Sequence, residues 1–142
     1  MLDLTPTRRA AIDRRLLEDV IIWLTTVSPT GKPHTVPVWF FWEGDSMLIF
    51  CEPETKKIRN LRQNPAVTLA LDSRDDGEEV IVFEGNVELS SETTSDLMTA
   101  GYIDNYARLF PRTGSTPDQM KVKYTQPLRF TPAKIIAWGI PE

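Results

Sequence analysis

The stretch PHTVPVWFFWEGDSMLIFCEPETKKIRNLRQN, residues 33–64, carries the strongest indication of the architecture. It predicts two strands joined by a tight turn and followed by a helix. The helix opens with a hydroxyl and two lysines, on Thr55, Lys56 and Lys57. The first amides of a helix have no partner within it, and the helix macrodipole favours negative charge there. This helix start therefore predicts a phosphate-binding site.

The first of these strands is apolar on both faces. Residues 35–42 read TVPVWFFW, whereas a half-buried antiparallel strand alternates apolar and polar residues. The interior of a six-stranded barrel can hide one face, and a partner subunit or a flat aromatic ligand can cover the other. Pro37 cannot donate to a ladder, so the strand is expected to bulge or lie at an edge there. These features favour a homodimer with a cofactor at the subunit interface.

Turn residues and hydrophobic periodicity divide the rest of the chain. The expected strands are residues 20–28, 33–43, 46–51, 67–72, 79–89 and 128–140. The expected helices are residues 5–19, 54–64, 91–109 and 117–124, with a loop at 111–116. The first three strands are expected to form a meander, and the last to bend near Pro132. In the first helix, Ile12, Leu16 and Leu17 are expected to face the core.

Composition limits the class of protein. A chain of 142 residues with 41% hydrophobic content can bury one core, so residues 1–142 are expected to form a single domain. The formal net charge of −4 and the lack of a long basic stripe argue against nucleic-acid binding. One cysteine and one histidine exclude an internal disulfide and most zinc sites. No apolar run suits a signal peptide or a membrane span, so we expect a soluble, cytoplasmic protein.

The polar residues at the start of the second helix allow two interpretations. They are Thr55, Lys56, Lys57, Arg59 and Asn60. This group could be the solvated face of a surface helix, with Ile58 and Leu61 as its buried side. It also follows an apolar strand that ends at Cys51, so a ring bound to the strands could extend a phosphate toward it. That geometry favours a binding site.

Individual residues elsewhere support fewer conclusions. Cys51, at the end of a buried strand, is expected to be a packed thiol rather than a nucleophile. His34 could be a haem ligand or a proton donor, the alternative being an exposed histidine beside a turn. Trp39 or Trp138 is expected to stack on a bound ring. Residues 72–79 lack the oxygen ligands of a calcium loop and are expected to form a hairpin turn.

Three stretches resemble the pyridoxamine 5′-phosphate oxidase-like superfamily of flavin-binding split barrels. They are TKK with NP at residues 55–57 and 64–65, FEGNVE at 83–88, and LRFTP at 128–132, followed by Ile135 and Trp138. Residues 22–27, 37–40 and 57–61 are, more narrowly, similar to a small actinobacterial-type branch regarded as F420-dependent enzymes. The resemblance implies a mainly β fold, a six-stranded antiparallel split β-barrel with peripheral helices. It also implies a homodimer with two cofactor sites, each at the subunit interface.

The resemblance also assigns residues to the cofactor. Lys56 and Lys57 correspond to the basic pair that binds the phosphate, with Thr55 as a hydroxyl donor, and Asn60 belongs to the same helix start. The other corresponding residues are Val36, Pro37, Val38 and Trp39 along the ring edge, Phe50 and Cys51 beside the ribityl portion, and Trp138 near the site.

Two departures from the vitamin B6 oxidases bear on the reaction. Val36 and Val80 stand where those enzymes carry an arginine and a glutamine, which argues against pyridoxal phosphate synthesis and weakens the case for FMN. The resemblance therefore favours coenzyme F420 and hydride transfer to or from an electron-poor small organic substrate. No side chain need be a catalytic base, and solvent or Tyr106 could donate a proton.

Three alternatives remain open from the sequence. The first is an FMN-dependent oxidoreductase of the same family, and the second is a flavin or haem carrier without turnover, with His34 as the available haem ligand. The third is a dimer without a ligand, whose lysines are merely solvated. The sequence identifies neither the substrate nor a metal site.

Overall fold

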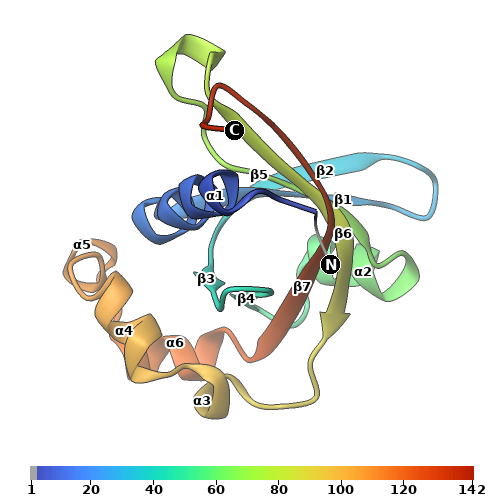
Figure 1. The fold of residues 1–142 in the computed structure, drawn as a ribbon. Coiled ribbons are helices and arrows are strands. Elements are labelled where there is room, and N and C mark those ends of the chain that lie inside the picture. The colour runs from blue at the N-terminus through green and yellow to red at the C-terminus, as the bar shows by residue number, and fades with distance from the viewer. Residues whose placement is uncertain (1–2) are drawn as a thin grey trace.

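The centre of the protein is an antiparallel sheet that curls around a core, and the computed structural model describes it within residues 3–142 (Figure 1). The strands are β1 (Ile21–Val27), β2 (Pro33–Trp39), β3 (Phe41–Trp42), β4 (Met47–Cys51), β5 (Ala66–Ala70), β6 (Val80–Leu89) and β7 (Gln126–Trp138). Their order in the sheet is β2-β1-β5-β6-β7-β4-β3. The predicted mainly β split barrel is therefore confirmed, with seven strands in place of six.

The additional strand arises because one expected strand is broken at Phe40. β2 pairs with β1, whereas β3 pairs with β4, so the chain passes from one edge of the sheet to the other at this residue. The backbone N–H of Phe40 donates to the hydroxyl of Tyr106 at 2.9 Å instead of to a neighbouring strand. The expected edge position of Pro37 is confirmed. The expected meander is wrong, because β4 pairs along its whole length with β7.

Helix α1 (Pro6–Glu18) is capped by the side chain of Thr5, as expected. Ile12 and Leu16 are buried, but Leu17 is 62% exposed, so its assignment to the core is wrong. Leu17 lies about 100° around the helix from Leu16, on the solvent side. On the other side of Leu16 the buried face continues with Arg15, whose guanidinium pairs with Asp19 at 2.8 Å and with Glu79 at 3.1 Å.

The long helix expected at residues 91–109 is wrong. The segment between β6 and β7 contains α3 (Thr94–Leu97), α4 (Ala100–Tyr106), α5 (Phe110–Thr113) and α6 (Pro117–Lys123). Thr93 and Thr99 each accept a hydrogen bond from a backbone amide in the next turn, so each starts a new helix. The predicted loop at 111–116 is wrong in part, because Pro111 lies in the first turn of α5. Thr116 and Gln119 form a capping box at the start of α6.

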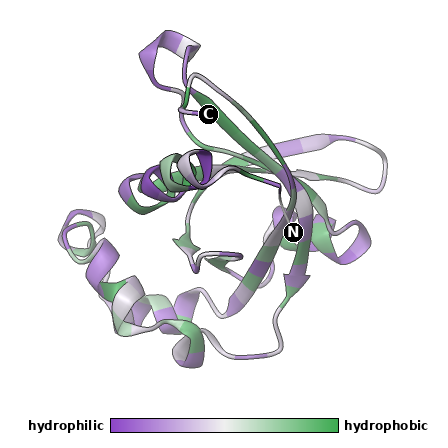
Figure 2. Cartoon of the chain, viewed as in Figure 1, coloured by the Kyte–Doolittle hydropathy of each residue, from purple (hydrophilic) through white to green (hydrophobic). Residues whose placement is uncertain are grey.

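Two hydrophobic clusters share strand β4, which is buried on both faces. Met47, Ile49 and Cys51 face the barrel interior, whereas Leu48 and Phe50 face the helices α4–α6. Figures 1 and 2 show these helices together on one side of the sheet, and hydrophobic residues concentrated in the strands around the interior. The apolar second face of the strand at 35–42 is therefore partly covered by helices of the same chain.

The expected bend of the last strand is a β-bulge. The register between β6 and β7 moves from Glu84 opposite Lys134 to Gly85 opposite Pro132, which leaves Ala133 as the extra residue. A Cβ on Gly85 would lie 2.3 Å from the carbonyl oxygen of Thr131, so only glycine fits this crossing. Helix α2 (Lys56–Gln63) begins two residues after the expected start, with Thr55 as its N-cap residue, and residues 72–79 form the predicted turn. Within residues 3–142 no helix combines the length and the apolar character needed to cross a membrane.

Gly85→Ala should lower the free energy of unfolding by about 2 to 4 kcal/mol, because backbone atoms at the bulge must move apart. Gly101→Ala is the matched control, since its nearest neighbour is a Phe41 ring atom at 3.4 Å and the residue lies within α4. The control should be neutral or stabilise by roughly 0.5 to 1 kcal/mol. Urea unfolding of both variants measures the difference, and equal effects would contradict the packing of Gly85.

Candidate functional site

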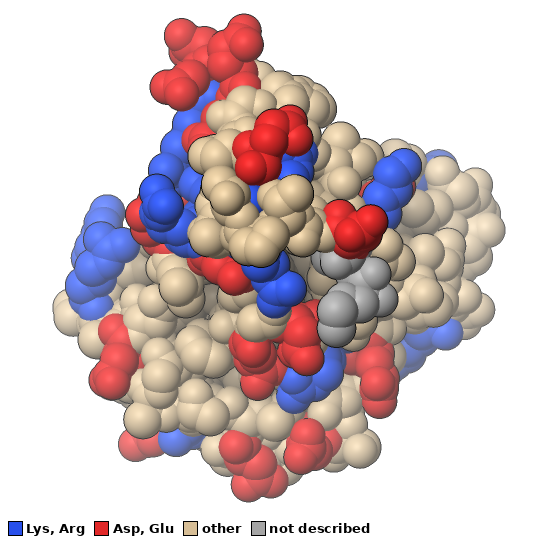
Figure 3. Space-filling view, viewed as in Figure 1, with Lys and Arg blue, Asp and Glu red and all other residues tan. Residues whose placement is uncertain are grey.

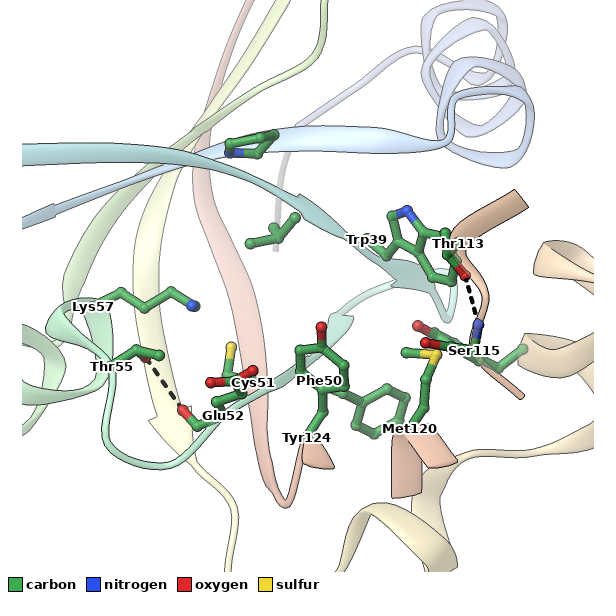
Figure 4. Close-up of a pocket in the computed structure, with 13 residues that line it drawn as sticks. Trp39, Phe50, Cys51, Glu52, Thr55, Lys57, Thr113, Ser115, Met120 and Tyr124 are labelled. Carbon is green, nitrogen blue, oxygen red and sulfur yellow. Dashed lines mark hydrogen bonds between the residues drawn. The ribbon is translucent and has the colours of Figure 1, made fainter. Parts of the chain in front are cut away.

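A cavity of about 470 Å³ lies where β2 and β4 end, beside the start of α2 and the helices α4–α6 (Figure 4). Its lining is Pro37, Val38, Trp39, Phe50, Cys51, Glu52, Thr55, Lys57, Tyr102, Thr113, Ser115, Met120 and Tyr124. Figure 4 shows Lys57 and Trp39 at opposite ends. We call Glu52, Thr55 and Lys57 the lysine end. The aromatic end consists of Trp39, Phe50, Tyr102, Met120 and Tyr124.

The lysine end carries a cation without an acidic partner. Glu52 pairs with Lys123 at 3.4 Å, whereas no ion pair involves Lys57 among the residues that the structure describes. The hydroxyl of Thr55 donates to the carbonyl oxygen of Glu52 at 3.2 Å, which shapes the turn into α2. The first backbone N–H groups of α2 and the ammonium group of Lys57 together favour an anion at this end.

Cys51 separates the two ends. Burial raises the pKa of its thiol to about 11, and the positive charge of Lys57 offsets part of this rise. The thiol is therefore protonated at neutral pH and weakly nucleophilic. Its position in the barrel core agrees with the packed thiol that the sequence predicts.

The aromatic end is held in place by stacked rings. The indole of Trp39 stacks on Tyr106 with ring centroids 4.5 Å apart and planes 6° apart, and it meets Phe110 edge-on at 5.7 Å. Phe50 meets Tyr102 edge-on at 4.9 Å. Such contacts fix the rings beyond what burial alone does, so the aromatic end has a defined shape.

Tyr106 is a structural residue. Its hydroxyl accepts from the backbone N–H of Phe40 and lies within hydrogen-bond distance of the carbonyl oxygens of Phe40 and Val20. Burial raises the pKa of this phenol. The idea that Tyr106 donates a proton to a substrate is therefore wrong, because its hydroxyl serves the strand break at Phe40 and does not line the cavity.

Seven of the predicted site residues line the cavity: Pro37, Val38, Trp39, Phe50, Cys51, Thr55 and Lys57. Four do not. Val36 lies opposite Leu24 on the barrel side of β2, and Lys56 is exposed on α2. Asn60 is buried and donates to the hydroxyl of Thr26 at 3.0 Å. Trp138 is 51% exposed on the sheet, and its indole N–H donates to the carbonyl oxygen of Gly77 at 3.1 Å.

Sequence reasoning missed the wall that α4–α6 contribute. Its residues in the cavity are Tyr102, Thr113, Ser115, Met120 and Tyr124. They lie far along the chain from residues 37–57 and meet them only because the helices pack on β4. The aromatic residues at helical spacing, Tyr102 and Tyr106, were the available indication that this segment has a buried face.

A second hollow lies along α2, the helix whose Lys57 belongs to the lysine end. It is an open groove of about 530 Å³ lined by Pro29, Lys56, Arg59, Asn60, Arg62 and Gln63, which we call the basic groove. Lys56 and Lys57 are neighbours in the first turn of α2, so the helix carries cations from the cavity to the groove. Figure 3 shows a different face, where both signs are interspersed and acidic side chains gather at the tip of the β5–β6 turn.

No group of three or more histidine, cysteine, aspartate or glutamate residues in the described chain is arranged to hold a metal ion. His34 lies on β2 opposite Thr26 and does not line the cavity.

Comparisons with known proteins identify the fold. Similar crystal structures include a conserved hypothetical protein of Mycobacterium tuberculosis, with a TM-score of 0.74, 23% identity, and 99% of this chain and 91% of that chain covered. An F420 reductase matches with a TM-score of 0.63, 25% identity and coverage of 85% and 93%. HutZ, the haem storage protein of Vibrio cholerae, matches with a TM-score of 0.65, 17% identity and coverage of 91% and 93%.

Sequence comparison identifies the family. No curated protein matches the chain significantly. The family model described as pyridoxamine 5′-phosphate oxidase matches residues 9–139, nearly the whole chain. The chain therefore belongs to the pyridoxamine 5′-phosphate oxidase family, in agreement with the resemblance that its sequence indicates.

Proposed function

We propose that the protein is an oxidoreductase that transfers hydride between coenzyme F420 and an electron-poor small organic substrate. The observation that carries this proposal is one continuous cavity with stacked aromatic rings at one end and, at the other, a lysine that has no ion pair within residues 3–142. A cofactor with a phosphate group and a flat ring matches these two ends, the phosphate with the lysine and the ring with the aromatic side chains. The similarity to an F420 reductase over 85% of the chain supports this choice of cofactor.

The residues present fit such a cofactor. Lys57 and the first amides of α2 would hold the phosphate. The ring would lie along Pro37, Val38 and Trp39, where the edge position of β2 leaves backbone groups without a ladder partner. Cys51 and Phe50 would line the chain between ring and phosphate. The bound cofactor supplies the hydride chemistry, while these residues orient it and exclude water.

The basic groove supports F420 over FMN. FMN ends at its phosphate, whereas F420 continues into a lactyl and glutamate tail that carries further carboxylates. Lys56 and Arg62 line this groove, and Arg62 has only a loose pair with Glu54, at 3.8 Å. The tail would reach them by passing over the start of α2. FMN has no part that would reach these cations. An FMN-dependent oxidoreductase of the same family remains the alternative, and the titrations below distinguish the two.

We also propose that two copies pair through an outer sheet face. Register places Pro37, Trp23, Ala70, Val82 and Ile136 side by side across five strands, with Trp138 beside Val80 at the next position. Trp23, Ile136 and Trp138 are 37%, 36% and 51% exposed, a concentration of apolar area that typically marks an interface. Pro37 belongs to both this face and the cavity, so a partner bound here borders the site.

Lys57→Ala should weaken the binding of both F420 and FMN by about 1.5 to 3 kcal/mol, or roughly 10- to 150-fold, because a charge-assisted phosphate contact is lost. Lys121→Ala on α6 is the control, since this lysine lies outside the cavity. Fluorescence titration of the purified protein measures both affinities. Unchanged affinity in Lys57→Ala would contradict the phosphate assignment.

The double variant Lys56→Ala/Arg62→Ala tests the cofactor's identity. It should weaken F420 about tenfold and leave FMN within a factor of two, because only F420 reaches the groove. The loss should grow with the number of glutamates in the tail and shrink at high salt. Equal losses for FMN, or no dependence on tail length, would argue against the groove as a tail site.

Ile136→Glu tests the outer sheet face. A buried unpaired carboxylate at a dimer interface should convert a dimer into monomers, as measured by light scattering after size exclusion. Leu17→Glu adds the same charge at an apolar position that is 62% exposed on α1, and it should remain dimeric. A monomeric wild-type protein would contradict this interface.

A further inference from the structure

The aromatic end of the cavity contains the hydroxyl of a buried tyrosine that makes no hydrogen bond within the described residues. Tyr102 is 1% exposed and lines the cavity, yet its phenol oxygen makes no hydrogen bond within residues 3–142. Each fully buried side-chain nitrogen and oxygen atom of the described residues has a partner. The hydroxyl of Tyr102 must therefore meet the open volume of the cavity. A few polar groups in a mostly apolar cavity fix the orientation of a bound molecule, and this hydroxyl is available for that role.

Folding does not account for this hydroxyl. Tyr106 lies one helical turn further along α4, is equally buried, and has its hydroxyl fully engaged with backbone groups of Phe40 and Val20. A phenylalanine at position 102 would keep the edge-on contacts of Tyr102 with Phe50 and Phe41. The oxygen of Tyr102 is therefore not needed for these ring contacts, and it takes no part in the hydrogen bonds within residues 3–142.

The surroundings define the chemistry of the ligand. Burial raises the pKa of Tyr102, and its neighbours Tyr106, Cys51 and Tyr124 raise it further, so the phenol stays protonated and acts as a donor. The charged residues of the cavity, Glu52 and Lys57, both belong to the lysine end. Around Tyr102 the lining consists of aromatic rings, Met120 and neutral hydroxyls. This end suits a flat, uncharged molecule that presents an acceptor oxygen.

We propose that Tyr102 recognises a carbonyl oxygen of a flat, uncharged ligand at the aromatic end by donating a hydrogen bond to it. The inference rests on the proposed function and deepens it by naming a substrate class, conjugated carbonyl compounds such as quinones. A ring carbonyl of the cofactor has the same acceptor chemistry. Separate binding measurements distinguish these two sources.

Equilibrium dialysis of the full chain against 2,3-dimethyl-1,4-naphthoquinone tests the donor role. Its two methyl groups block addition of the Cys51 thiol to the ring. Tyr102→Phe should weaken quinone binding about five- to tenfold, the value of one neutral hydrogen bond. It should leave 2,3-dimethylnaphthalene, which has the same shape without the oxygens, unchanged.

F420 is titrated against the same variant. Weaker quinone binding with unchanged F420 binding assigns the acceptor to the substrate, and weaker F420 binding assigns it to the cofactor ring. The donor role is overturned if Tyr102→Phe weakens the binding of neither the quinone nor F420, or if it weakens the binding of the quinone and of the hydrocarbon equally. It is also overturned if the wild-type protein binds neither the quinone nor the hydrocarbon. If the wild-type protein does not bind F420, but Tyr102→Phe still weakens the binding of the quinone and not of the hydrocarbon, the proposed function is refuted and this inference stands.

Thermal unfolding provides the structural control. Tyr102→Phe should keep the melting temperature of the wild type, whereas Tyr106→Phe should lower it by several degrees because the buried N–H of Phe40 loses its acceptor. A melting temperature lowered equally in both variants would assign Tyr102 a structural role and overturn the proposal.

Discussion

The contact between the Tyr106 hydroxyl and the backbone of Phe40 underlies both the barrel and the cavity. A chain that passes from one edge of a sheet to the other must interrupt its hydrogen bonding to the neighbouring strand. The backbone N–H and C=O groups at that interruption are buried, so they need other hydrogen-bond partners. Tyr106 supplies them from α4, and its ring stacks on Trp39, the residue just before the break. One side chain therefore supports the break between β2 and β3, docks the helical segment and positions the wall of the site.

The polarity of the cavity follows from which elements build each end. The lysine end is formed by the turn from β4 into α2, where unpaired amides and side-chain cations occur together. The aromatic end is formed where helices pack on the outer face of β4, which favours large apolar rings. An elongated ligand with an anionic terminus fits in one orientation, with its anion at the lysine end and its apolar part at the aromatic end. The fold itself therefore sets much of the ligand's orientation.

The strands of the barrel could be predicted because the patterns that indicate them lie within short segments of the sequence. Short apolar runs, turn residues and Pro37 identify the strands, and Lys57 follows β4 so closely that its place at the cavity depends on few further contacts. Asn60 and Lys56 share that helix, but the direction of each side chain depends on packing against β1, which local patterns do not report. The meander was wrong because β7, from the far end of the chain, pairs with β4. Tyr102 escaped notice for the same reason, since its neighbours Phe50 and Phe41 are some fifty to sixty residues away.

Strand β4 separates two cores of different extent. The inner core draws on residues from α1 through the last strand, whereas the outer core depends on the helical segment between β6 and β7 and on the strand faces it covers. Segments with fewer buried contacts open at lower free energy than the whole domain. Transient loosening of the helices would therefore change the shape of the cavity while the barrel stays folded. The doubly buried strand lets one wall of the site adapt without global unfolding.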